Sequence, residues 1–82
     1  MRLVRIGRGE TSDRRLSDPT VSRRHAELVV LDDGRLYLSD CASTGGTFVE
    51  QNRAWEPVRQ GFVDAEARVK FGNVVVRAAE LK

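Results

Sequence analysis

The chain has 82 residues, of which 40% are hydrophobic and 32% are charged, so it carries enough apolar material for one compact core. No apolar run approaches the roughly 20 residues that a membrane-spanning helix needs. One cysteine and one histidine cannot form an internal disulfide or supply the Cys and His ligands of a protein zinc site. We therefore expect a single domain over residues 1–82 that needs no metal or cofactor, works in the cytoplasm and does not bind a membrane.

The positive charge is concentrated near the N-terminus. The first 25 residues carry seven arginines against Glu10, Asp13 and Asp18, although the net charge of the whole chain is only +2. Nucleic acid, a membrane surface and a phosphorylated protein all present phosphate groups to arginine, so this segment suits any of the three. An ordinary solvated arginine-rich surface would explain the charge equally well.

The first half of the chain contains three predicted strands. Residues 4–6 alternate apolar and charged side chains, and residues 26–31 form a run of strand-favouring residues. Residues 36–38 follow after a turn at residues 32–34, where Gly34 can adopt a positive φ. The runs at 26–31 and 36–38 should therefore pair as a hairpin.

The second half of the chain also contains short predicted strands. Residues 47–49 predict a short strand, and residues 69–71 should pair with residues 74–76 across the turn at Gly72 and Asn73. Only residues 64–67 hint at a helical turn. Many short strands without a long helical period predict an all-β fold, a sandwich or a small barrel. The expected core residues are Ile6, Ala26, Leu28, Val30, Leu36, Leu38, Phe48, Val69, Phe71, Val74 and Val76.

Three polar clusters interrupt the apolar alternation, at residues 7–9, 21–25 and 43–47, and each lies at a predicted strand end. A phosphate dianion needs a guanidinium for bidentate pairing, hydroxyl donors, and backbone N–H groups exposed in glycine-rich turns. The clusters together contain all three kinds of group, which indicates a phosphate-binding surface.

These clusters also carry a family resemblance. Gly7-Arg8, then Val-Ser-Arg-Arg-His-Ala at residues 21–26, then Asp-Cys-Ala-Ser-Thr-Gly-Gly-Thr at residues 40–47 resemble the motifs of forkhead-associated (FHA) domains in order, identity and spacing. The resemblance extends from about Ile6 to Val76. It implies a β-sandwich of two sheets with short, mostly antiparallel strands, whose loops at one end hold a phosphothreonine of a partner protein. The module would be a non-catalytic signalling adaptor.

The resemblance also implies a role for each motif residue. Arg8 is similar to the arginine that pairs with phosphate or steadies its loop, and Ser22 to the hydroxyl donor. Arg23 resembles a basic neighbour that adds a second charge, and Thr44 the loop residue near the phosphothreonine methyl group. The residues expected to support the site without touching the ligand are Gly7, His25, Asp40 and Gly46.

Two departures from the family pattern bear on binding. Gly45 stands where the family has an asparagine that holds the peptide backbone, and loss of such hydrogen bonds would weaken binding by roughly 1 to 3 kcal/mol. The strand that normally precedes Gly7-Arg8 is expected to be missing or supplied from elsewhere, and an uncovered sheet edge favours an edge-strand dimer. Glu66-Ala67 also replaces the usual Gly-Asp before the last hairpin.

Three alternative functions stay open at this point. A degenerate FHA scaffold would bind an unphosphorylated partner or itself, with Trp55 among its contacts. An enzyme would use Ser22 or Ser43 as nucleophile, His25 as base and Asp40 as its orienting partner. A nucleic-acid binder would use the arginines with Tyr37 or Trp55, but these aromatics are not interleaved with the arginines, so we expect no nucleic-acid partner.

Overall fold

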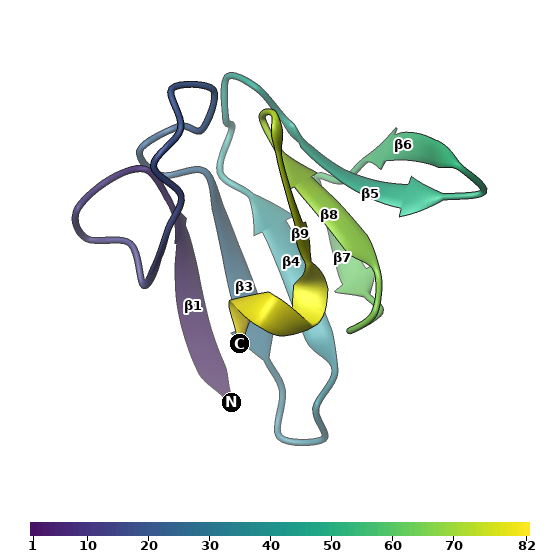
Figure 1. The fold of residues 1–82 in the computed structure, drawn as a ribbon. Coiled ribbons are helices and arrows are strands. Elements are labelled where there is room, and N and C mark those ends of the chain that lie inside the picture. The colour runs from purple at the N-terminus through teal and green to yellow at the C-terminus, as the bar shows by residue number, and fades with distance from the viewer.

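Nine short strands and one four-residue 3-10 helix make up the molecule in a computed structural model that describes residues 1–82 (Figure 1). In chain order they are β1 (Arg2–Gly7), β2 (Arg14–Arg15), β3 (Ala26–Val30), β4 (Leu36–Asp40), β5 (Thr47–Gln51), β6 (Ala54–Pro57), β7 (Gln60–Val63), β8 (Arg68–Phe71), β9 (Val74–Arg77) and η1 (Ala78–Leu81). The structure has no helix with the length and apolar character that crossing a bilayer requires.

The strands form two sheets. One has five strands in the order β2-β1-β3-β4-β7, and the other has four in the order β6-β5-β8-β9. Every pair is antiparallel except the short parallel pairing of β1 with β2. The predicted all-β sandwich of two sheets is confirmed.

Alternation along the strands decides which side chains face the core. Val4, Leu28 and Leu38 are neighbours across β1, β3 and β4, and each is at most 1% exposed. Because successive side chains point to opposite faces, the residues beside them face outward, as Leu3 does at 47% exposure. The predicted hairpin of β3 with β4 and that of β8 with β9 are both confirmed.

The core agrees with most of the sequence prediction. Ile6, Ala26, Leu28, Leu36, Leu38, Val69 and Phe71 are buried, and Val30, Val74 and Val76 are partly buried against them. Phe48 is not part of the core, because it lies on the outer face of its sheet with the Lys70 ammonium 5.1 Å from its ring centroid. The buried residues that the pattern missed are Val4, Val21, Ala78 and Leu81.

The chain between residues 52 and 68 differs most from expectation. Residues 64–67 form a single hydrogen-bonded turn, with the Ala67 N–H donating to the Asp64 carbonyl at 3.0 Å, and the only helix is η1. Strands β6 and β7 have no clear apolar alternation and were not predicted. They form because β5 and β4 offer them open edges for backbone pairing.

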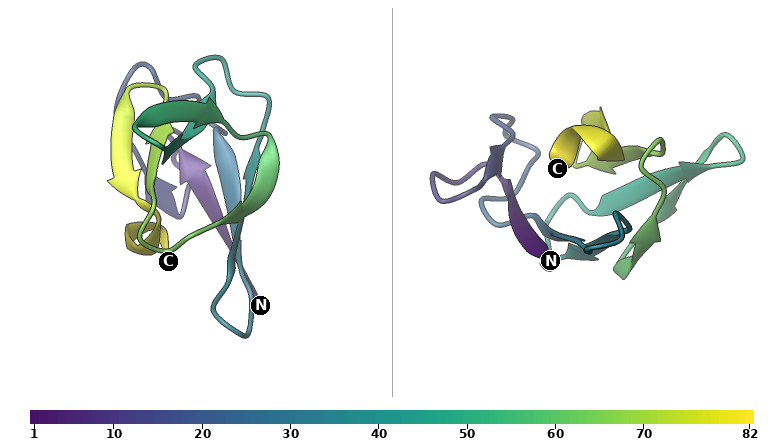
Figure 2. Two further views of the ribbon diagram at one scale, coloured as in Figure 1. Left: turned by 90° about the vertical axis from the view of Figure 1, so that its right-hand side faces the viewer. Right: turned by 90° about the horizontal axis from the view of Figure 1, so that it is seen from below.

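The loops that carry the polar motifs gather at one end of the sandwich. In Figure 1 the segment between β2 and β3, the β4–β5 loop and the β8–β9 turn lie at the top and the segment between β1 and β2 lies at the left, whereas the N-terminus and the β3–β4 turn lie at the bottom. The left view in Figure 2 shows the same separation between the loop end and the β3–β4 turn. The fold therefore brings together residues from four distant parts of the sequence.

Candidate functional site

A depression of about 420 Å³ opens at the loop end of the sandwich. Of the five residues predicted to contact the ligand, Arg8, Ser22, Thr44 and Gly45 line it. Its complete lining is Arg8, Pro19, Thr20, Val21, Ser22, Thr44, Gly45, Gly72 and Asn73.

The first wall of the depression is made by two loops that are hydrogen-bonded to each other. The Arg8 N–H donates to the Ser22 carbonyl at 2.9 Å, and the Gly9 N–H donates to the Arg23 carbonyl at 3.1 Å. A Cβ atom on Gly7 would lie 2.1 Å from the Arg23 carbonyl oxygen, far inside any real contact. The loops can approach this closely only because residue 7 is glycine.

The guanidinium of Arg8 is held by one of its nitrogens and free at the other two. Its Nε donates to the Val21 carbonyl at 2.9 Å, and no carboxylate of the chain pairs with it. The two terminal nitrogens keep their donors for a ligand. A planar fork fixed in this way is suited to two oxygens of one phosphate group.

Ser22 connects the first wall to the second. Its Oγ accepts a hydrogen bond from the Thr44 backbone N–H at 3.0 Å. The hydroxyl proton of Ser22 is not used in that bond, so it can donate to an anion in the depression. Thr44 itself is exposed and lines the depression.

His25 lies beneath these loops and is fully buried. Its Nδ1 accepts the Ser22 backbone N–H at 3.0 Å, and its Nε2 lies 2.8 Å from the Gly46 carbonyl oxygen. Because a backbone N–H can only donate, the ring proton is on Nε2 and bonds to Gly46. The ring packs edge-on against Phe71 with centroids 5.6 Å apart. His25 therefore joins the two loops from below and does not line the depression.

Asp40 organises the second loop. Its carboxylate accepts the Ser43 hydroxyl at 2.5 Å, the Ser43 backbone N–H at 3.0 Å and the Thr47 hydroxyl at 2.7 Å. Burial raises the pKa of Asp40, but the hydrogen bonds from Ser43 and Thr47 outweigh that effect and hold its pKa below the ordinary value. Gly46 follows with φ +84°, a conformation that favours glycine, and donates its N–H to Ser43 Oγ at 3.0 Å.

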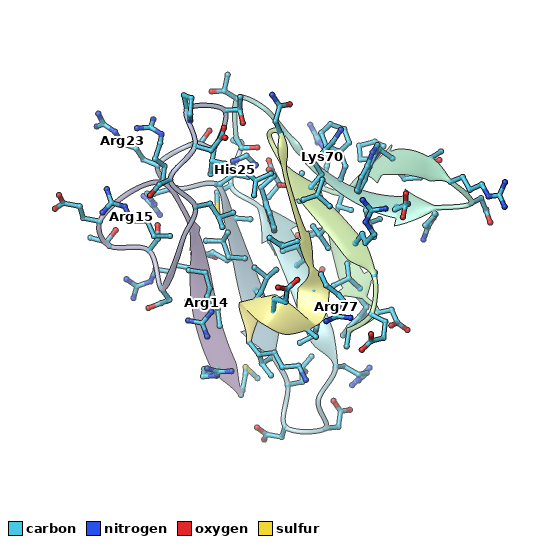
Figure 3. The ribbon with its side chains drawn as sticks, in the orientation of Figure 1. Arg14, Arg15, Arg23, His25, Lys70 and Arg77 are labelled. Carbon is cyan, nitrogen blue, oxygen red and sulfur yellow. The ribbon has the colours of Figure 1, made fainter.

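Arg23 and Gly45 differ from the other predicted ligand residues. Arg23 is exposed and does not line the depression, and Figure 3 shows its side chain at the outer margin of the loops, away from His25. Gly45 does line it, but a Cβ there would lie 2.8 Å from the Thr20 carbonyl oxygen and 3.0 Å from Gly72 Cα. Residue 45 thus contributes backbone and close packing to the wall.

Besides Pro19 and Val21, the lining residues that sequence reasoning missed are Thr20, Gly72 and Asn73. The Thr20 hydroxyl donates to Asp18 Oδ1 at 2.5 Å and accepts the Asn73 backbone N–H at 2.9 Å. That contact brings the β8–β9 turn against the loop before Val21. The Gly-Asn pair was visible as a hairpin turn, but nothing in the sequence indicated which loop it would touch.

The side chains considered for acyl transfer are not arranged for it. Both ring nitrogens of His25 are engaged by backbone groups, and the Asp40 carboxylate accepts from Ser43 and Thr47 instead of orienting His25. His25 therefore has no free nitrogen with which to take a proton from Ser22 or Ser43, and Asp40 does not orient it. No group of three or more His, Cys, Asp or Glu side chains is placed to hold a metal ion.

The aromatic residues considered for nucleic-acid binding lie on different sheets. Tyr37 is on β4, where its ring packs edge-on against Phe62 with centroids 5.0 Å apart. Trp55 is on β6 of the other sheet, with the Lys70 ammonium 4.9 Å from its ring centroid. They do not form one stacking platform.

Comparison with known proteins identifies the fold. Two solved FHA structures each share 32% identity over 92% of this chain, with a TM-score of 0.78. The first comes from a study of phosphothreonine-dependent FHA domain interactions, and the match covers 75% of its length. The second is the FhaA FHA domain in complex with the intracellular domain of Rv3910, and the match covers 79% of its length. The FHA domain of the CT664 protein from Chlamydia trachomatis shares 25% identity over 90% of this chain and 71% of its own, with a TM-score of 0.78.

Among the curated proteins no match is found. The family model of the FHA domain matches residues 4–72, a span that contains all three polar loops and most of both sheets. The chain therefore belongs to the FHA domain family.

Proposed function

We propose that this domain binds protein segments that contain phosphothreonine, and that it acts as a non-enzymatic adaptor in signalling. The observation that carries the proposal is the convergence of the free end of the Arg8 guanidinium, the Ser22 hydroxyl and Thr44 on one depression. Two of the solved relatives support it, since one was studied for phosphothreonine-dependent interactions and the other in complex with a protein partner.

The chemistry of the depression suits a phosphate dianion. Hydrogen bonds that involve a charged group contribute about 1.5–3 kcal/mol each, and Arg8 can make two of them to one phosphate. The Ser22 hydroxyl can donate a third from the same wall. The loops that carry these donors are already joined by backbone bonds and by His25, so little conformational entropy is lost when the ligand binds.

The remaining parts of the proposal concern where the domain works and what else it contacts. A phosphorylated protein partner in the cytoplasm agrees best with the sequence, and neither nucleic acid nor a membrane is required. The alternative is a scaffold that binds an unphosphorylated protein. Gly45, which has no side chain to offer a peptide, favours that alternative, whereas the unpaired guanidinium end of Arg8 favours phosphate.

The test is an NMR titration of the isotope-labelled domain with matched threonine, phosphothreonine and phosphoserine peptides from a degenerate library. We expect shifts at Arg8, Ser22 and the Thr44 loop with phosphothreonine peptides only. Arg8→Ala should weaken binding by more than about 30-fold and Ser22→Ala by roughly 10- to 150-fold, because each removes donors to the phosphate.

The matched control is Arg35→Ala, which removes an exposed arginine from the opposite end of the sandwich, where it pairs with Asp33. It should bind as the parent domain does. The unphosphorylated partner would be favoured if the Arg8→Ala and Ser22→Ala proteins bound phosphothreonine peptides as tightly as the parent domain does. It would also be favoured if the folded parent domain responded to no phosphorylated peptide.

A further inference from the structure

We propose that the side-chain amide of Asn73 hydrogen-bonds the main chain of the bound segment beside its phosphorylated residue. Asn73 would thus position the peptide, while Arg8 and Ser22 hold the phosphate. This inference rests on the phosphopeptide-binding function proposed above and deepens it.

Asn73 belongs to a wall that is continuous with the phosphate donors. The β8–β9 turn lies directly against the β4–β5 loop, because Gly72 N–H donates to the Gly46 carbonyl at 3.1 Å and a Cβ on Gly45 would lie 3.0 Å from Gly72 Cα. Asn73 and Thr44 therefore line the same depression as Arg8. A segment anchored at Arg8 can therefore reach Asn73 along this wall.

The backbone of Asn73 is held in place from below. Its N–H donates to Thr20 Oγ1 at 2.9 Å, and the Thr20 hydroxyl in turn donates to Asp18 at 2.5 Å. At Gly72, φ is +56° and a Cβ would lie 2.2 Å from the Thr20 carbonyl oxygen, so the turn can sit this close only with glycine there. These contacts fix the position of the Asn73 backbone, from which its side chain extends.

The side chain itself has no partner in the chain. Asn73 is exposed, and its only hydrogen bond is the one made by its backbone N–H. A side-chain amide offers two donors and one acceptor, so it can pair with both the N–H and the C=O of an extended peptide. Pro19 and Gly45 have no polar side-chain atom, and the Thr20 hydroxyl is already engaged. Among the lining residues, Asn73 is the one that carries an amide.

The experiment compares Asn73→Ala with the parent domain by calorimetric titration of a phosphothreonine peptide selected from the library. Asn73 is not among the residues with positive φ, so alanine fits its backbone. We expect a loss of affinity of roughly 5- to 150-fold, the effect of two neutral hydrogen bonds. Gln60→Ala, which removes an exposed amide that does not line the depression, is the matched control and should bind normally.

A second set of peptides tests whether the contact is with the main chain. Methylating the peptide nitrogen of the residue on either side of the phosphothreonine removes one N–H at a time. At one of these positions the parent domain should lose affinity, whereas Asn73→Ala should show little further loss, because its partner for that N–H is already gone. Additive losses at both positions would overturn the inference.

The outcomes separate this inference from the proposed function. Normal binding by a folded Asn73→Ala protein, with binding still lost in Arg8→Ala, would overturn the role of Asn73 and leave phosphopeptide recognition standing. If the parent domain binds no phosphothreonine peptide at all, both proposals fail together.

Discussion

At the scale of single residues, the site is held together by small polar groups whose hydrogen bonds are all satisfied. No buried side-chain nitrogen or oxygen lacks a partner. His25 connects the loop of Ser22 to that of Gly46, and Asp40 connects Ser43 to Thr47. A buried polar group without a partner costs about 1–3 kcal/mol, so each of these residues stabilises the loops only while its partners are present.

The pKa of Asp40 leads to a pH-dependent prediction. Because the folded protein holds this pKa below the ordinary value of 3.8, the carboxylate contributes stability above that pH and loses it as the pH falls through the lower folded value. We expect Asp40→Asn to lower the free energy of unfolding by about 1–2 kcal/mol at pH 7. Urea titrations of both proteins from pH 7 to pH 2 measure the difference.

The comparison with Asp40→Asn isolates this carboxylate from Asp18 and Asp33, whose pKa values are also lowered by hydrogen bonds from Thr20 and Arg35 respectively. The difference in the free energy of unfolding between the parent and Asp40→Asn proteins should decrease as the pH falls below 3.8. A gap that stays constant down to pH 2 would show that the charge of Asp40 is not what stabilises the loop.

At the scale of elements, the β5–β6 hairpin shows how a strand can form without a strong sequence signal. Gln51 pairs with Ala54, so the turn contains only Asn52 and Arg53, and both have positive φ, at 51° and 64°. Two such residues in a two-residue loop make a type I′ turn, whose twist matches the flanking strands. Asparagine suits its position, whereas arginine at a positive φ is unfavourable.

This mismatch predicts a stabilising substitution. Arg53→Gly should raise the free energy of unfolding by about 0.5–1 kcal/mol, because glycine adopts the required conformation without steric cost. For a domain of this size that corresponds to a melting temperature higher by several degrees, measurable by calorimetry. Arg59→Gly, at an exposed position without positive φ, should be neutral or destabilising. Equal effects of the two substitutions would contradict this account of the turn.

At the scale of the whole molecule, the two sheets leave strands with one unpaired side. Strand β9 pairs only with β8, and its Val75 is 39% exposed. An edge strand presents free N–H and C=O groups to another chain. The edge-strand dimer predicted from the sequence therefore stays a prediction, with β9 as a suitable edge.

Sedimentation velocity over a range of concentrations tests this prediction. We expect a concentration-dependent dimer in the parent domain, shifted toward monomer by Val75→Lys, because a charge on an edge strand opposes pairing. The same charge placed at the exposed Gln60 position, Gln60→Lys, tests the β7 edge separately. A monomer at every concentration would mean that the edges stay unpaired.

The amino-acid sequence determined the fold class, the two main hairpins and most of the core, because alternation and turn chemistry are local properties. It also marked Arg8, Ser22, Thr44 and Gly45 as neighbours through motifs whose order and spacing are typical of the FHA family. The prediction of Phe48 as a core residue was wrong, since an alternating pattern does not show which face of a strand is covered by the other sheet.

Which loops touch depends on how the two sheets pack. The packing of Gly72 and Asn73 against Thr20 and Gly45 depends on contacts between residues up to 53 positions apart, which no local pattern encodes. The same is true of β6 and β7, which form through pairing to β5 and β4. Local residue types thus determine where the strands form and which side chains can bind phosphate. Long-range backbone contacts determine the shape of the site, because a wall made of four loops exists only when the two sheets pack.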